Sequence, residues 1–244
     1  NALLIFMLPH SIITISIVTA LLPTLSKFAH EKRSDLIHDQ LVRAMRLVGI
    51  VTVPSAVAFL AFGPLITRTL FFGISRADGN YLGYVLSAFA LGLLPMSANL
   101  IALRGLNAFE NVKLQVLSNF IMNLLGSVIA IGCAVYLNPK WVTVGLAASL
   151  SLSYFVGAWT TLRLLHRYNI RIHLGEVAGL YLRLAGIFLI IAVPLRVVLR
   201  FIPGGNTLHL LVVLAIAGLG YIGAARVFKI EEVGSAFNLL LRRS

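Results

Sequence analysis

Long runs of apolar residues, separated by short polar segments, dominate the pattern of this chain. A helix rises about 1.5 Å per residue and a bilayer core is about 30 Å thick, so about 20 uncharged apolar residues predict a membrane-spanning helix. Scanning for such runs predicts an all-α polytopic membrane helix bundle of about seven transmembrane helices. The runs cover roughly Asn1–Leu25, Leu47–Phe72, Tyr81–Leu103, Leu114–Leu137, Trp141–Leu162, Val177–Leu199 and Leu208–Ala225.

The sixth run is the weakest of the seven, because Arg183 and Arg196 interrupt it. Arginines near helix ends can extend to the headgroup region, so the run is kept as a span. Several connections between runs are short and rich in Gly, Pro and Asn, which predicts antiparallel neighbours in a compact bundle. The segment from Ser34 into the second run is expected to be a short amphipathic helix that continues into the span.

Lysine and arginine are distributed unevenly between the two sides that seven spans define. The side of the first connecting loop carries 15 of these residues and the other side carries 5. Positively charged loops stay in the cytoplasm, so Asn1 is expected outside and Ser244 inside.

Composition agrees with a membrane protein: 59% of the 244 residues are hydrophobic and 11% are charged. The net charge of +12 is explained by membrane topology and by anionic lipids as partners, because no basic cluster is interleaved with stacking aromatics. Nucleic acid is therefore not an expected partner.

The two ends of the chain suggest a piece of a longer protein. The chain starts inside an apolar run without Met, so a preceding N-terminal part is expected. Residues 228–244 have apolar positions at helical spacing beside basic residues. A cytoplasmic amphipathic tail in the headgroup plane and a linker to a further cytoplasmic domain explain this pattern equally well.

The chain offers little for catalysis. All eight acidic residues fall in expected loops, at span edges or in the tail, so no carboxylate is expected in the membrane core. The histidines do not have metal-ligand spacing, and we find no nucleophile triad or phosphate-binding loop. We therefore expect no catalytic residues, no metal and no cofactor.

One polar stripe marks the fourth span. Gln115, Asn119 and Asn123 are four residues apart, so their side chains share one helical face. Such a face either lines a wet cavity or makes hydrogen bonds to neighbouring helices. The first span has a weaker polar set that includes His10 and Ser16.

Residues 9–26, PHSIITISIVTALLPTLS, combine a proline with small and apolar residues and finish with a Leu-Pro-x-Leu-Ser ending. This segment resembles the eighth helix of the MurJ (MviN) family of lipid II flippases. Pro54-Ser-Ala-Val57, Gly63-Pro64 and the loop Arg104-Gly-Leu-Asn-Ala-Phe-Glu-Asn111 follow in the family's order and spacing. The position of a cavity arginine in family members aligns with Leu4 here.

The resemblance implies the C-terminal half of a fourteen-helix transporter of the multidrug/oligosaccharidyl-lipid/polysaccharide (MOP) exporter superfamily. Residues 1–166 would be family helices 8–12, and residues 167–227 the two additional helices 13 and 14. The partners implied are lipid II, or a related undecaprenyl-linked lipid, and a missing N-terminal lobe of the same chain. The basic tail is similar to that of actinobacterial relatives, some of which continue into a cytoplasmic kinase-like domain, so a regulatory domain is a further expected partner.

Transport is thus the expected function: a lipid II flippase working by alternating access, which places undecaprenyl-linked precursor in the outer leaflet for cell-wall synthesis. The substrate-cavity candidates are Asn119, Asn123, Gln115, Arg104, His10 and Ser16. Two alternatives stay open: an exporter of another polysaccharide-linked lipid, and a non-transporting membrane scaffold for cell-wall enzymes.

Overall fold

The computed structural model describes residues 2–71, 73–173, 175–199, 201 and 205–227, and within these ranges it is helical without strands. The tail 228–244 lies outside the described residues. The helices are α1 (Ala2–Pro9), a π-helical segment η1 (His10–Thr14), α2 (Ile15–His30), α3 (Ser34–Leu70), α4 (Arg76–Ala90), α5 (Leu93–Ala108), α6 (Val112–Tyr136), α7 (Val142–Leu165), the short 3-10 helix η2 (His166–Tyr168), α8 (Gly175–Val198) and α9 (Asn206–Val227).

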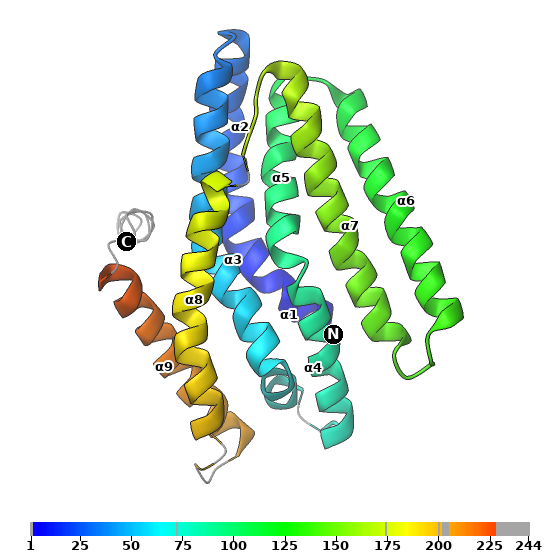
Figure 1. The fold of residues 1–244 in the computed structure, drawn as a ribbon, viewed down its shortest axis with the longest axis vertical. Coiled ribbons are helices and arrows are strands. Elements are labelled where there is room, and N and C mark those ends of the chain that lie inside the picture. Colours follow the sequence, from blue (N-terminus) through cyan, green and yellow to red (C-terminus); the bar gives the residue numbers. More distant parts are fainter. Residues whose placement is uncertain (1, 72, 174, 200, 202–204, 228–244) are drawn as a thin grey trace.

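The helices form an elongated bundle in which successive connections alternate between two ends (Figure 1). The connections after α2, α5 and α7 lie at one end, and those after α3, α6 and α8 lie at the other. This is the alternation that the seven expected spans require. Five helical segments within the described ranges are long and apolar enough to cross a membrane: Ser34–Leu70, Arg76–Ala108, Val112–Tyr136, Val142–Tyr168 and Gly175–Val198.

The first and seventh expected spans are also helical but differ in form. The first is divided into α1 and α2 by the π-helical segment η1. The seventh corresponds to α9, whose apolar part, Asn206–Tyr221, is a shorter helix. The sixth expected span is α8, with Arg183 and Arg196 both exposed, as side chains that extend out of a membrane core would be.

The third expected span consists of two helices, α4 and α5, that meet at Gly92. The Gly92 amide donates to the Phe89 carbonyl rather than continuing the α-helical pattern, which leaves the Ala88 carbonyl without its usual donor. The hydroxyl of Ser151 in α7 donates to that carbonyl at 2.8 Å. A Cβ on Gly92 would lie 2.7 Å from Ser151 Oγ, so glycine is needed for this close approach.

Helix α3 is the centre of the bundle. Its buried side chains contribute to all three hydrophobic clusters: one with α2 and α5, one with α8 and α9, and one with α1, α4 and the start of α5. Its closest neighbour is α4, where a Cβ on Gly83 would overlap the backbone N and Cα of Pro64. Small residues at this crossing let the two backbones touch, as is usual in membrane helix pairs.

The amphipathic segment before the second span is confirmed as the start of α3, which runs without a break from Ser34. This part of α3 also holds α8 in place. The guanidinium of Arg46 donates to the Glu176 carbonyl at 2.9 and 3.1 Å, and His38 Nε2 lies 3.1 Å from Glu176 Oε2. The hydroxyl of Tyr181 donates to the Met45 carbonyl. The division of the chain into two units between residues 166 and 167 stays a prediction. The contacts just described cross this division, since they join α8 to α3.

Candidate functional site

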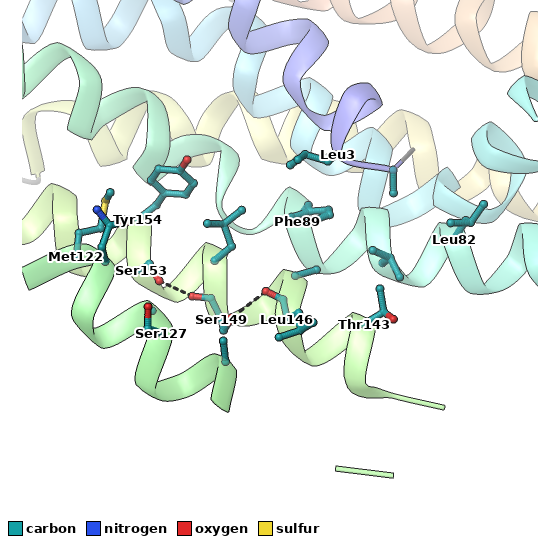
Figure 2. A pocket seen from close by; sticks show the side chains of 17 residues that line it. Leu3, Leu82, Phe89, Met122, Ser127, Thr143, Leu146, Ser149, Ser153 and Tyr154 are labelled. Atoms are coloured by element: carbon teal, nitrogen blue, oxygen red, sulfur yellow. Dashed lines mark hydrogen bonds between the residues drawn. The ribbon is translucent and has the colours of Figure 1, made fainter. Parts of the chain in front are cut away.

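A cavity of about 540 Å³ lies between α1, α4, α6 and α7. Figure 2 shows side chains from these helices pointing toward one space, among them Leu3, Phe89, Ser127 and Tyr154. Elements far apart in sequence meet here because α7 packs on both α4 and α6, and α6 and α7 are antiparallel neighbours (Figure 1). The complete lining is Ala2, Leu3, Leu82, Val85, Phe89, Met122, Asn123, Gly126, Ser127, Ala130, Thr143, Leu146, Ala147, Ser149, Leu150, Ser153 and Tyr154.

The polar groups of this cavity are amides and hydroxyls, and none of its lining residues is charged. Two serines use their hydroxyls within their own helix: Ser149 donates to the Leu146 carbonyl at 2.8 Å and Ser153 to the Ser149 carbonyl at 2.7 Å (Figure 2). Asn123 and Ser127, by contrast, are exposed on the α6 wall. A neutral wall of this kind can hydrogen-bond the hydroxyls of a sugar, but it supplies no cation for a phosphate.

The polar stripe predicted on the fourth span is divided by the structure. Asn123 lines the cavity, as a cavity-facing residue should. Gln115 and Asn119 are half-buried on α6 and are not among the lining residues. The stripe therefore contributes one of its three candidate side chains to this cavity.

On a neighbouring face of α6, a second set of polar side chains forms hydrogen bonds that join three helices. Thr161 of α7 donates to Asn99 of α5 at 2.7 Å and lies 2.7 Å from Ser118 of α6. All three side chains are buried. Interhelical hydrogen bonding was the predicted alternative to a wet cavity for the polar face of the fourth span. The structure has both on α6: this network and, beside it, the cavity.

The two candidates of the first span have different outcomes. His10 is buried, and its Nδ1 lies 3.1 Å from the hydroxyl oxygen of Ser97 in α5. The Ser97 hydroxyl also lies 3.0 Å from the Leu93 carbonyl, so the direction of the bond between His10 and Ser97 depends on the tautomer of His10. His10 thus links η1 to α5 and does not line the cavity. The side chain of Ser16 lies outside the described residues.

Arg104 lies near the other end of the bundle, in the last part of α5. It is half-buried, and its Nε is buried without a hydrogen-bond partner in the described part of the chain. It is not among the cavity residues. Leu4, the position at which the resemblance implies a cavity arginine in family members, is 70% exposed on α1, next to the lining residue Leu3.

Sequence reasoning missed the α7 wall of the cavity. Ser149, Ser153, Gly157 and Thr161 recur every four residues, which is a helical face of small and polar side chains. Two of these four line the cavity and one belongs to the network with Asn99. The spacing of four residues was the available signal, but it fits a helix–helix contact as well as a cavity wall. The packing of α6 against α7 decides between these two.

A second cleft, of about 480 Å³, lies between α3, α5, α7 and α8 and is lined almost entirely by apolar and aromatic side chains. Three of its lining side chains are exposed: Phe155, Trp159 and Leu182. For metals, the described residues contain no group of three His, Cys, Asp or Glu side chains that could hold an ion.

Comparisons with known proteins agree with this architecture. The family model described as "Lipid II flippase MurJ" matches residues 1–215. The chain is 24% identical over 232 residues to a Bdellovibrio bacteriovorus protein named "Probable lipid II flippase MurJ", covering 93% of this chain and 44% of that protein. A solved structure described as "Lipid II flippase MurJ, inward closed conformation" is similar with a TM-score of 0.74 and 19% identity, over 94% of this chain and 46% of that one.

The chain spans less than half the length of both relatives. The structural likeness, at this low identity, shows the fold. The family model shows more, because it matches residues 1–215 of the 244. This membrane protein chain therefore belongs to the MurJ lipid II flippase family.

Proposed function

We propose that the protein containing this chain moves lipid II, the undecaprenyl-diphosphate-linked peptidoglycan precursor, across the bacterial cytoplasmic membrane by alternating access. The family match over residues 1–215 is the observation that carries this proposal. The chain would form one of the two lobes, and transport rather than catalysis would be its task. The other lobe would come from the missing N-terminal half.

The chemistry of the two clefts supports a substrate with a sugar part and a lipid part. The cavity beside α6 offers amide and hydroxyl groups, which bind sugar hydroxyls without the cost of burying a charge. The apolar cleft beside α8 suits a prenyl chain. The diphosphate needs cationic donors, and because the α6 cavity has none among its lining residues, we assign those donors to other parts of the complete protein.

The first experiment measures access to lipid II from outside in cells acutely depleted of the full-length protein. An externally added enzyme that cleaves only outward-facing precursor should release less product, while the total lipid II pool holds or rises. Unchanged cleavage would refute the proposal. Accumulation of a different lipid-linked glycan would instead identify an exporter of that glycan.

The cavity itself is tested by complementing the depleted cells with single variants. Asn123→Ala removes a cavity-lining amide, so outward lipid II should fall severalfold at equal protein level. Asn119→Ala is the matched change one helical turn away, outside the lining residues. If Asn119→Ala alone lowers outward lipid II, the sugar site lies elsewhere on α6.

We place the connections after α2, α5 and α7 in the cytoplasm, because 15 of the 20 basic residues are on that side of the predicted topology. In a Cys133→Ser background, Lys140→Cys and Lys32→Cys report on opposite ends of the bundle. A membrane-impermeant maleimide added to intact cells should label Lys140→Cys alone. Labelling of Lys32→Cys alone would reverse the orientation.

A further inference from the structure

We propose that the outward ends of α3, α8 and α9 form a binding site for a lipid phosphate, with Arg68, Arg196 and His209 as its donors. These three side chains line a cleft of about 200 Å³ that is separate from both clefts described above. The inference depends on the proposed function only for the choice of which end of the bundle faces outward.

The three donors come to one place because of their positions along the helices. Arg68 is in the last turn of α3, Arg196 in the last turn of α8, and His209 in the first turn of α9. The α8–α9 connection lies at the same end of the bundle as the end of α3 (Figure 1). Their shared floor is made by Ala61, Phe62, Pro64, Leu65 and Leu199.

Arg68 is held in a fixed position. Its Nε donates to the Pro64 carbonyl at 2.9 Å, and its methylene stem packs against Gly79, where an added Cβ would lie 2.5 Å from Arg68 Cγ. Its two terminal nitrogens make no hydrogen bond within the described ranges. An anchored guanidinium with free terminal nitrogens is a donor prepared for a phosphate oxygen pair.

Among the described residues, no carboxylate forms an ion pair with Arg68 or Arg196. The four ion pairs found among the described residues are all at the opposite end of the bundle, and Arg196 takes part in none of them. Asp78 is the one acidic residue of the described chain at this end, and its carboxylate accepts the hydroxyl of Ser75. Arg76 adds a further positive charge that acts on Arg68.

The distribution of the outward cations supports a specific role. Basic residues are disfavoured on the outward side of a membrane protein, and only five of the 20 are expected there. Arg68 and Arg196 line this cleft, and Arg76 is close enough to influence Arg68. Lys140, on the α6–α7 connection, stands apart from them.

A lipid phosphate is the ligand that fits this place. Liquid water occupies about 30 Å³ per molecule, so the cleft has room for a phosphate group. Phe62, Leu65 and Leu199 are buried beneath it, which lowers the local dielectric and strengthens the attraction of an anion. The cleft is at the ends of membrane-spanning helices, where the phosphates of outer-leaflet lipids lie.

The experiment uses the purified full-length protein in detergent and measures lipid binding by native mass spectrometry. The probes are phosphatidylglycerol and phosphatidylcholine, with inorganic pyrophosphate as a free-phosphate competitor. The variant Arg196→Gln removes an exposed donor that makes no hydrogen bond within the described ranges, so folding should be kept. Lys140→Gln is the matched control, an outward cation of equal charge away from the cleft.

We expect Arg196→Gln to weaken phosphatidylglycerol binding about tenfold, the usual worth of one charge-assisted hydrogen bond, with Lys140→Gln within about twofold of wild type. Arg68→Lys keeps the charge but loses the paired donors, and should give an intermediate loss. Equal losses in Arg196→Gln and Lys140→Gln, or none in either, would overturn the site. Pyrophosphate binding as tight as that of phosphatidylglycerol would overturn the lipid assignment.

The two proposals fail separately. A protein that does not flip lipid II but still prefers phosphatidylglycerol in an Arg196-dependent way would refute the proposed function and support this site. A protein that flips lipid II but whose phosphatidylglycerol binding does not change in Arg196→Gln would support the proposed function and refute this site.

Discussion

Helices α3 and α6 are nearly equal in apolar character and opposite in environment. Their most apolar stretches have mean hydropathies of 1.9 and 1.8, yet 56% of that stretch is buried in α3 and 6% in α6. α3 is surrounded by neighbours from α1 to α9, whereas α6 packs mainly on α7 at one side of the bundle (Figure 1). Hydropathy thus reports that a helix avoids water, and not whether it meets lipid or protein.

The difference lies in the small residues. At the α3–α4 crossing, Gly63 and Gly83 bring two backbones into contact. On α6, the corresponding close contact is at Gly126, where an added Cβ would meet Ser153 Oγ of α7. The opposite face of α6 is made of large exposed side chains such as Phe120, Val128 and Ile131. Helix association in a membrane depends on packing, so glycine contacts identify a protein-facing side better than apolarity does.

The largest effect should come from a phenylalanine pair. Phe62→Ala in α3 removes a ring that is 3% exposed, so the cavity it leaves should cost about 3 kcal/mol of stability. Phe120→Ala in α6 removes a ring that is 60% exposed and should cost less than about 1 kcal/mol. Thermal unfolding of the purified full-length protein in detergent measures both. Equal costs would mean that α6 is covered in the complete protein.

A glycine pair should show a smaller difference. Gly83→Ala places a methyl group against the Pro64 backbone, and such overpacking costs about 1–3 kcal/mol. Gly132→Ala in α6 meets nothing within 4 Å, so its better helix propensity should leave stability unchanged or raise it. The same unfolding assay applies, and a stable Gly83→Ala protein would contradict the backbone contact between α3 and α4.

The polar link between α6 and its neighbours should have the smallest effect. Thr161→Val removes the donor to Asn99 and the partner of Ser118, which should cost about 1 kcal/mol. Thr160→Val removes a hydroxyl that bonds only within its own helix, to the Val156 carbonyl, and is the matched control. A double-mutant cycle with Ser118→Ala would show no coupling if the α6–α7 hydrogen bond is absent.

The helices could be predicted from sequence, because charge-free runs of membrane length have few alternatives to helix. What the runs cannot show is the interruption of a helix by packing. The break at Gly92 depends on Ser151, which is 59 residues away, and the π-helical segment at His10–Thr14 leaves no mark in an apolar run.

The candidate site was predictable only in part, for a related reason. Helical spacing placed Gln115, Asn119 and Asn123 on one face correctly, but a face about 100° wide holds both a cavity wall and a helix contact. Which amide lines the cavity depends on the position of α7. The basic cleft at Arg68, Arg196 and His209 could not be found by spacing at all, since its three donors come from three helices.

The length of α3 has a mechanical consequence. A continuous helix of 37 residues is about 55 Å long, which exceeds the hydrocarbon core by about 25 Å. The excess, paired with the end of α2, forms a stiff arm that is joined directly to the centre of the bundle. Because an arm magnifies rotation at its tip, small tilts of this lobe in the proposed transport cycle would become large displacements there. Labels at the tip would record the motion of the lobe while leaving every cleft untouched.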